Sequence, residues 1–157
     1  MRVYRIEREK YLKSTLSGIG AAQSEGNRWN SLYTSMVYTA ESRALANLEV
    51  AVHLDLSEDL PTDRHYVEIN IPDDIEILEL STKDLPVNWD NKPPINKTRL
   101  IGDAFIKSME AAVLKVPSSI ISREYNYLIN PMHADAAKIK VMSTQYFTFD
   151  SRLKHAE

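Results

Sequence analysis

The chain has 157 residues, 43% of them hydrophobic and 26% charged, and its 19 basic and 22 acidic side chains give a formal net charge of -3 at pH 7. This composition excludes a disordered chain, and the length is that of one domain with a single core. The small acidic excess argues against direct nucleic-acid binding, and the lack of cysteine excludes disulfides, thiolate metal sites and cysteine nucleophiles.

The amino-terminal segment Met1–Lys10 alternates charged and apolar residues, which is unlike the apolar stretch of a signal peptide. Within this segment, Val3–Ile6 predicts a short strand. No apolar run in the chain approaches the roughly 18 residues that are needed to span a bilayer. We therefore expect a soluble, cytoplasmic protein with no membrane association.

A loop, a strand and a helix are predicted next. Ser17–Asn30 is loop-like and contains three of the four glycines. Val37–Thr39 predicts a second short strand, and a helix is expected from about Glu41 to Leu56. Thr39 is the expected N-cap, and Glu41 lies in the first turn, where a negative charge is favoured.

The middle of the chain predicts a hairpin followed by a long surface segment. His65–Ile71 alternates apolar and polar residues, and the turn formers Pro72–Asp74 lead into a strand over Ile75–Leu80. Ser81–Lys97 has three prolines and little apolar periodicity, so we expect it to be a surface excursion. A second helix is predicted from about Thr98 to Glu110. Its expected apolar stripe consists of Leu100, Ile101, Phe105 and Met109.

The last third of the chain predicts further strands. Val113–Val116 and Ile120–Ile121 are strand-like on either side of Pro117–Ser119, and Ile139–Phe149 is expected to form a late strand. The elements indicate a single compact α+β domain over residues 1–157, with a mixed, mostly antiparallel sheet and flanking helices.

Glu49 is the first residue that suggests chemistry. At about 100° per residue, it lies about 40° from Leu45 and inside the apolar stripe that Leu45, Val52 and Leu56 form on the predicted helix. A carboxylate on a core-facing stripe is costly unless a partner or a cavity receives it. Glu49 is therefore either a functional carboxylate or a residue at the rim that reaches water or pairs with an arginine.

The segment Gly26–Asn30, with the sequence GNRWN, precedes the second strand. The planar guanidinium of Arg28 suits a phosphate group, and Gly26 allows a ligand to approach the backbone closely. The alternative is an ordinary polar loop with Trp29 as its aromatic anchor. Tyr38, at a strand end, either stacks on an aromatic ring of a ligand or is a core residue with a hydrated hydroxyl.

Small polar residues near the end of the chain form a third candidate group. Ser118 and Ser119 follow a proline between two apolar segments, where their hydroxyls are placed to face a pocket. Asn126 and Asn130 lie at the same pocket or serve in turns, because asparagine forms local Asx hydrogen bonds.

Familiar catalytic and metal-binding motifs are absent from the sequence. Gln23 stands where the dinucleotide fingerprint that begins at Gly18 requires a third glycine or alanine. There is no P-loop, GxSxG or HExxH sequence, and the four histidines lack metal-ligand spacing. We expect no metal site.

Five segments resemble, in their order along the chain, the RES domain: GNRWN, VYTAESRALANLE, VPSSI, NYLINPMHADA and FTFDSRL. The resemblance runs from Tyr4–Ile6 to Phe149–Leu153, which is nearly the whole chain. The family is named for its arginine, glutamate and serine, and it contains the toxins of bacterial RES–Xre toxin–antitoxin pairs. By position, its arginine, tyrosine, glutamate and serine correspond to Arg28, Tyr38, Glu49 and Ser118.

The resemblance implies a set of site residues and a fold similar to that of ADP-ribosyltransferase toxins. The implied catalytic residues are Arg28, Tyr38, Glu49 and Ser118. The implied substrate-binding residues are Arg5, Arg28, Tyr38, Ser118 and Asn126.

The resemblance also implies an enzyme that cleaves the nicotinamide–ribose bond of NAD+, with water or inorganic phosphate as acceptor. NAD+ is then a substrate, and no bound cofactor is needed. Glu49 would stabilise the positive charge that develops on the ribose, and Arg28 would hold the diphosphate. Two alternatives are a protein ADP-ribosyltransferase that uses NAD+ and a non-catalytic member that acts only as a binding partner.

An inhibitory partner is also implied, because such an enzyme would exhaust the NAD+ of its host. The expected partner is an Xre-type antitoxin that blocks the active site and forms a hetero-oligomer with the toxin. The Ser17–Asn30 loop and the Ser81–Lys97 excursion are the expected surfaces for this contact.

Overall fold

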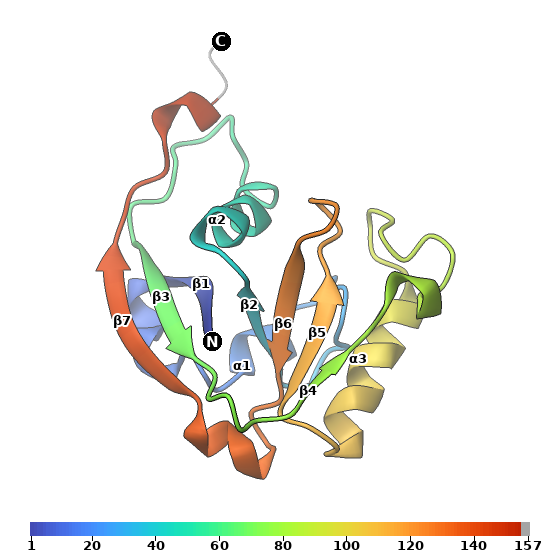
Figure 1. Ribbon diagram of the computed structural model, residues 1–157. Coiled ribbons are helices and arrows are strands. Elements are labelled where there is room, and N and C mark those ends of the chain that lie inside the picture. Colours follow the sequence, from blue (N-terminus) through green and yellow to red (C-terminus); the bar gives the residue numbers. More distant parts are fainter. Residues whose placement is uncertain (155–157) are drawn as a thin grey trace.

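One seven-stranded sheet organises residues 1–154, which are the residues that the computed structural model describes (Figure 1). Its strands are β1 Arg2–Arg8, β2 Val37–Ala40, β3 Arg64–Asn70, β4 Ile77–Glu79, β5 Val113–Pro117, β6 Tyr125–Ile129 and β7 Lys140–Tyr146. The α-helices are α1 Ile19–Ala22, α2 Arg43–Ala51 and α3 Asn96–Ser108. The 3-10 helices are η1 Glu9–Ser14, η2 Thr82–Asp84, η3 Ala134–Lys138 and η4 Ser151–Leu153.

The strand order is β4-β5-β6-β2-β1-β3-β7, and every pairing is antiparallel except that of β4 with β5. This confirms the predicted α+β fold with a mixed, mostly antiparallel sheet. No helix within residues 1–154 is long and apolar enough to cross a bilayer.

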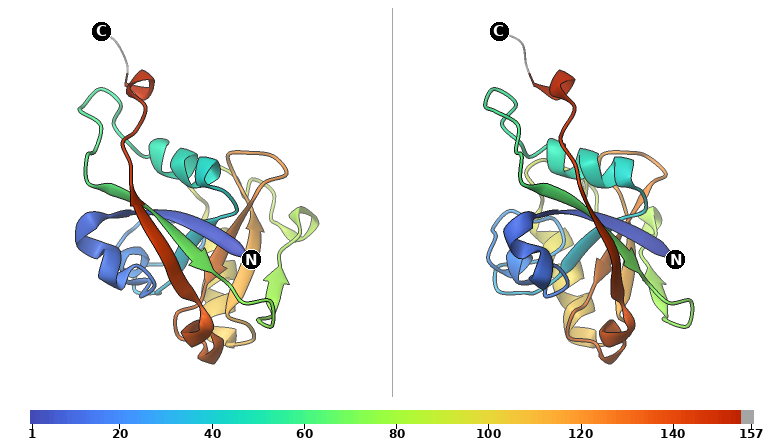
Figure 2. Two further views of the ribbon diagram at one scale, coloured as in Figure 1. Left: turned by 60° about the vertical axis from the view of Figure 1, so that its left-hand side comes forward. Right: turned by 90° about the vertical axis from the view of Figure 1, so that its left-hand side faces the viewer.

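The sheet is divided into two halves at its centre. β1 pairs with β3 along its full length, but β1 and β2 are joined only where Tyr4 faces Ala40. Beyond this point the strands of the two halves diverge, and Figure 2 shows β1, β3 and β7 crossing over the strands of the other half. The inner faces of the two halves share one apolar core, which includes Val3 and Val67 from one half and Val113 and Ile129 from the other.

Two smaller cores attach the long helices. Phe105 of α3 packs against Leu128 of β6 and Trp29, in a cluster that also holds Met36 and Val116. On the other side of the molecule, Leu45 and Ala46 of α2 pack against Ile6 and Ala40 at the junction of the two halves. α2 therefore sits at the point where the sheet opens, as Figure 1 shows.

The boundaries of α2 differ from the predicted ones. Ser42 is the N-cap, because its side chain accepts a hydrogen bond from the backbone N–H of Leu45, so the prediction of Thr39 was wrong. The helix ends at Ala51 instead of Leu56, and Val52 is 48% exposed, so Val52 is not part of the buried stripe.

The predicted hairpin of residues 65–80 was also wrong. β3 pairs with β1 and β7, whereas β4 pairs in parallel with β5 on the far side of the sheet. The alternation of polar and apolar residues predicts a strand but carries no information about its partner, and the turn at Pro72–Asp74 leads the chain from one half to the other.

Two other elements correct the sequence-based expectations. Ile120–Ile121 lies in the turn between β5 and β6, while the strand itself is Tyr125–Ile129, a segment whose asparagines indicated turns. On α3, Ile101 and Phe105 face the core as predicted, but Leu100 is 56% exposed and Met109 is a left-handed C-cap.

Candidate active site

Glu49 lies in the last turn of α2, a position where the helix dipole disfavours a negative charge. Its Oε1 accepts two hydrogen bonds, one from Ser118 Oγ at 3.1 Å and one from Asn126 Nδ2 at 2.7 Å. Within residues 1–154, Oε2 has no hydrogen-bond partner. The carboxylate is thus held by neutral donors at one oxygen and pairs with no arginine of these residues. Because Glu49 is half-buried, its other oxygen can meet water or a ligand.

Ser118 is a buried residue in the turn that follows β5. Besides donating to Glu49, its Oγ accepts hydrogen bonds from the backbone N–H groups of Ile120 and Ile121, both at 3.1 Å. A hydroxyl has one donor and two acceptor positions, so these three bonds use its full capacity. The same hydroxyl therefore shapes the turn and fixes the carboxylate.

Asn126 on β6 completes the anchorage of Glu49. Its Nδ2 donates to the carboxylate, and its Oδ1 is buried without a partner among the described residues. The reverse orientation of the amide would place Oδ1 against a carboxylate oxygen, so the charge of Glu49 selects the orientation present. An unsatisfied buried acceptor costs about 1–3 kcal/mol.

Arg28 approaches the site from the loop before β2. Its Nη1 donates to the backbone carbonyls of Trp89 at 2.6 Å and Asn91 at 3.1 Å, both in the excursion between η2 and α3. Burial lowers the pKa of Arg28, and the negative charge of Glu49 opposes this shift. The two groups form no ion pair, and their charges interact across a longer distance.

Tyr38 on β2 has its hydroxyl turned toward the loop that carries Arg28. The hydroxyl donates to Asn30 Oδ1 at 2.7 Å and accepts from the backbone N–H of Trp29 at 3.1 Å. Burial raises the pKa of Tyr38 far above its usual value, so the hydroxyl is neutral. Its ring packs against the cluster that contains Phe105 of α3, as the core alternative expected, and the two hydrogen bonds of its hydroxyl are with protein groups.

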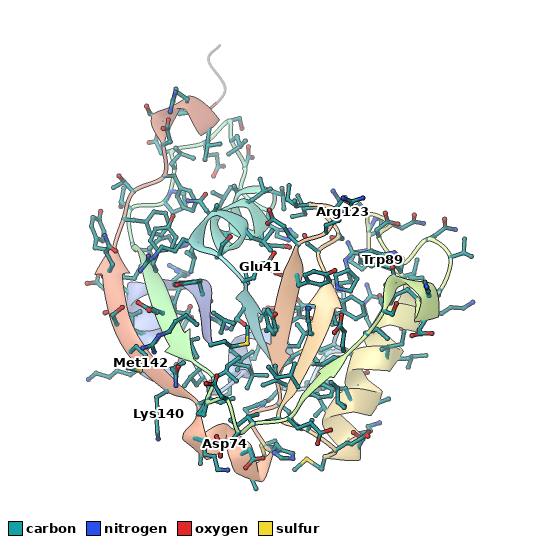
Figure 3. The ribbon with its side chains drawn as sticks, viewed as in Figure 1. Glu41, Asp74, Trp89, Arg123, Lys140 and Met142 are labelled. Carbon is teal, nitrogen blue, oxygen red and sulfur yellow. The ribbon has the colours of Figure 1, made fainter. Side chains whose placement is uncertain are left out.

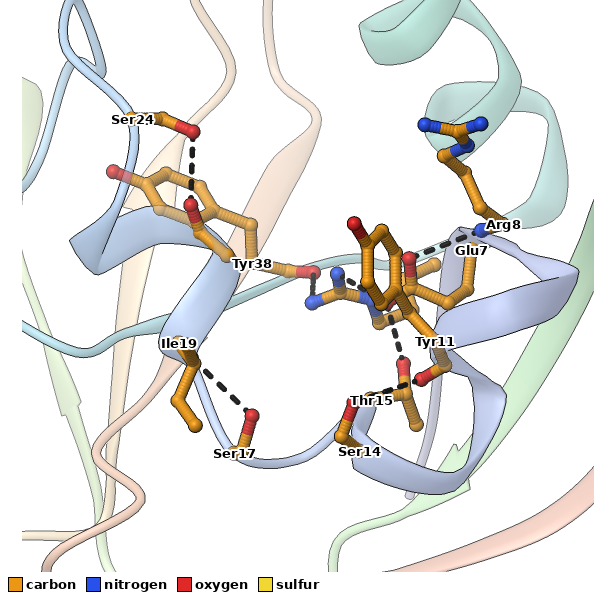
Figure 4. A network of polar contacts seen from close by, with 11 residues as sticks. Glu7, Arg8, Tyr11, Ser14, Thr15, Ser17, Ile19, Ser24 and Tyr38 are labelled. Carbon is orange, nitrogen blue, oxygen red and sulfur yellow. Dashed lines mark hydrogen bonds and ion pairs between the residues drawn. The ribbon is translucent and has the colours of Figure 1, made fainter.

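Arg5 on β1 is engaged by other residues. Its Nη2 forms an ion pair with Glu7 Oε2 at 2.9 Å, and its Nη1 lies 3.4 Å from the backbone carbonyl of Tyr38. Figure 4 shows the surrounding network, in which Thr15 also donates to Glu7. Burial lowers the pKa of Arg5, and the charge of Glu7 opposes this. The structure thus brings Arg5 to the backbone of Tyr38 and gives it no contact with Arg28 or Glu49.

Sequence reasoning missed two sets of contacts near Arg28. One is the hydrogen bond between Asn30 and Tyr38, and the other is made by the excursion. The excursion was expected as a surface segment and as part of the antitoxin contact. The structure adds that its carbonyls hold Arg28 and that the centre of its Trp89 ring lies 6.2 Å from that of Trp29. Figure 3 labels the side chains of Trp89 in the excursion, Arg123 in the turn between β5 and β6, and Glu41 ahead of α2. The feature of the sequence that could have indicated these contacts is Trp89, a large aromatic residue in an otherwise polar, proline-rich segment.

A fixed carboxylate with one free oxygen, near a guanidinium, suits a ligand that is anionic in one part and develops positive charge in another. Within residues 1–154, no group of three or more histidine, aspartate or glutamate side chains is placed to hold a metal ion.

Comparisons with known proteins agree on one family. The family model described as RES domain matches residues 2–150. The Prs ADP-ribosylating toxin of Sphingobium sp. strain YBL2 is 42% identical over 145 residues, which cover 91% of this chain and 89% of the relative. A protein named Toxin Res from Photorhabdus laumondii is 38% identical over 159 residues, which cover 100% of this chain and 99% of the relative.

The fold also matches a solved structure, the M. tuberculosis MbcT–MbcA toxin–antitoxin complex. The TM-score is 0.71, and the match covers 98% of this chain and 86% of the matched chain. At 16% identity, this likeness establishes the fold.

Proposed function

Because this chain belongs to the RES-domain family of toxins from toxin–antitoxin systems, we propose that it cleaves the nicotinamide–ribose bond of NAD+ and transfers the ADP-ribosyl group to water or inorganic phosphate. The observation that carries this proposal is the carboxylate of Glu49, fixed at Oε1 by Ser118 and Asn126 and free at Oε2.

The role of Glu49 follows from the chemistry of the bond that breaks. Nicotinamide leaves as a neutral base, so the leaving group needs little protonation. The ribose becomes positively charged in the transition state, and a carboxylate beside it stabilises that charge. The free Oε2 is the atom that we assign to this contact, either directly with the sugar cation or with a ribose hydroxyl.

Arg28 is proposed to bind the diphosphate of NAD+ or an incoming phosphate. A guanidinium offers five N–H donors, and only Nη1 is used in the described contacts, with Trp89 and Asn91. The remaining donors are available to phosphate oxygens. Its pKa is lowered by burial, yet arginine keeps its charge in proteins, so the site retains a cation for the anionic part of the substrate.

Ser118 and Asn126 are proposed to act on catalysis by positioning Glu49. The hydroxyl of Ser118 has no hydrogen-bonding capacity left for a substrate. The base in contact with it is the carboxylate of Glu49, to which we assign the stabilisation of the ribose, so Ser118 is not proposed as a nucleophile. Tyr38 is proposed to line the site with its ring while its hydroxyl supports the Arg28 loop. Arg5, which is paired with Glu7, is a proposed substrate contact only through an exchange of that partner.

A second candidate function is a protein ADP-ribosyltransferase. The name of the Sphingobium relative, Prs ADP-ribosylating toxin, favours it. The same carboxylate and guanidinium would serve both reactions, since the two differ in the acceptor and share the bond that is broken. A non-catalytic binding role remains the third alternative.

Product analysis separates these functions. Purified protein free of any antitoxin is incubated with NAD+, with and without inorganic phosphate, and the products are identified by mass spectrometry. Nicotinamide with ADP-ribose indicates hydrolysis, and nicotinamide with an ADP-ribose phosphate ester indicates phosphorolysis. If nicotinamide appears only when a cell extract is added, and a protein in that extract gains the mass of an ADP-ribosyl group, the chain is a protein ADP-ribosyltransferase. No nicotinamide in any of these mixtures refutes both enzymatic functions.

The partner is proposed to be an Xre-type antitoxin that covers the mouth of this site, in a cytoplasmic hetero-oligomer. The contact of Arg28 with Trp89 and Asn91 supports this, because it joins the two segments that flank the site. A complex in which both segments remain uncovered would contradict the proposed mode of inhibition.

A further inference from the structure

Arg28 is carried by a short segment, residues 27–31, whose backbone is fixed on two sides. We propose that Asn30 and Gly102 are positioning residues that aim the Arg28 guanidinium at the substrate. This inference rests on the proposed function of Arg28 and adds to it the residues through which the fold sets its direction.

Asn30 fixes the segment from the side of β2. It is 1% exposed, and its Nδ2 donates to the backbone carbonyls of Ala21, Ser31 and Thr34 at 3.0–3.1 Å. Its Oδ1 accepts from Tyr38, whose hydroxyl in turn accepts from the N–H of Trp29. One buried amide therefore connects α1, the loop after the segment and β2, and its position depends on all three.

α3 fixes the segment from the opposite side. A Cβ atom added at Gly102 would lie 1.6 Å from the carbonyl oxygen of Trp29, so the loop backbone rests directly on the helix. Arg99 Nε donates to the Asn27 carbonyl, and Asp103 Oδ1 accepts from the Ser31 N–H, both at 2.9 Å. A glycine inside a helix is normally unfavourable relative to alanine, and this close approach explains its presence.

The two sets of contacts hold the residues on both sides of Arg28. Asn27 is held through its carbonyl and Trp29 through its N–H, while the carbonyl of Trp29 lies directly against Gly102. The backbone of Arg28 is therefore held on both sides, and its side chain extends from this fixed position. A displacement of about 1 Å in a substrate-binding group is enough to lower the efficiency of catalysis by about 100-fold.

The test is the Gly102→Ala variant, with Gly20→Ala as the matched control. A Cβ at Gly20 meets no atom within 4 Å, so the control makes the same chemical change without displacing the segment. If Arg28 binds substrate, Gly102→Ala raises KM for NAD+ by about tenfold or more and keeps kcat within about twofold, because Glu49 lies on another element. Partial unfolding alone would lower the apparent kcat and leave KM unchanged.

A spectroscopic measurement tests the same idea independently of activity. Trp29 and Trp89 are the only tryptophans in the chain, and both lie beside Arg28. Gly102→Ala should shift their emission to longer wavelength and increase quenching by acrylamide, whereas Gly20→Ala should match the wild type. Tyr38→Phe, which removes only the hydroxyl between Asn30 and Trp29, should change emission in the same direction and decides the question if Gly102→Ala does not fold.

The outcomes separate the two proposals. A raised KM together with changed emission supports the positioning role, and an unchanged KM or unchanged emission overturns it. If the wild-type protein releases no nicotinamide, the proposed function fails, and emission alone then supports or overturns the fixed segment.

Discussion

The amide nitrogen of Asn126 lies 2.7 Å from Oε1 of Glu49, while the amide oxygen of the same residue is buried and has no partner among residues 1–154. The contact spans 77 positions in the sequence and joins β6 to the last turn of α2. Because Ser118 donates to the same oxygen, the carboxylate has one fixed and one free oxygen. This asymmetry is the basis of the following predictions.

Replacing Glu49 by glutamine should abolish most of the activity and keep the fold. The amide is nearly the same size but carries no charge for the sugar cation, and the loss of such a stabilising group lowers the rate by about 100- to 1,000-fold. Nicotinamide release measures the effect. Glu110→Gln, at an exposed position outside the site, should behave as wild type. Full turnover by Glu49→Gln would refute the role of this residue.

Replacing Asn126 by aspartate should make the activity depend on pH. A second carboxylate beside Glu49 makes it harder for both groups to ionise, and the reaction needs Glu49 ionised. On acidification, the variant should therefore lose activity at a higher pH than the wild type does. The acidic limb of the pH–rate profile should move upward by about one unit or more. Asn47→Asp is the control, because Asn47 lies on the same helix but donates to Tyr66. An unshifted profile would contradict the contact.

Replacing Ser118 by alanine should affect both stability and rate. It leaves two backbone N–H groups and one carboxylate oxygen with fewer partners, at a cost of about 1–3 kcal/mol in the free energy of unfolding. Urea unfolding and turnover measure the two effects. Ser119→Ala is the natural control, since the neighbouring hydroxyl makes none of these contacts; equal effects of the two variants would mean that the assignment to Ser118 is wrong.

Replacing Arg28 by lysine should weaken substrate binding more than it slows the chemical step. Lysine keeps the charge but loses the planar fork that pairs with phosphate, so KM for NAD+ should rise by about tenfold or more. Initial rates over a range of NAD+ concentrations give the two parameters. A variant whose kcat falls at unchanged KM would show that Arg28 acts on the transition state and does not anchor the diphosphate.

Local patterns predicted the strands and the inward carboxylate better than they predicted partners. The alternation in residues 65–71 predicted β3, and the wheel placed Glu49 toward the interior, where it meets Ser118 and Asn126. The pairing of β4 with β5 could not be read in this way, because it depends on contacts between segments far apart in the chain. Parallel pairing also requires a long crossover, which here contains the excursion and α3.

The remaining errors have local causes. The predicted helix continued past Ala51 because Val52 and Leu56 fit its period, although the chain leaves the helix before them. β6 was hidden because Asn126 and Asn130 suggested turns; Asn126 is in fact a strand residue whose amide serves Glu49. Asn126 contacts a residue of α2, and a polar residue with such a role interrupts the apolar pattern from which strands are predicted.

The position of Glu49 so near the end of α2 has a consequence for heat inactivation. Helix termini fray first, and the helix ends two residues beyond this side chain, at Ala51. The carboxylate of Glu49 is also hydrogen-bonded to Ser118 and Asn126 of the β5–β6 hairpin. Unfolding of residues 52–62 on warming therefore need not displace this carboxylate. Loss of turnover on heating should therefore follow melting of the hairpin, and amide exchange at Tyr125–Ile129 should report it more closely than exchange in the segment after α2.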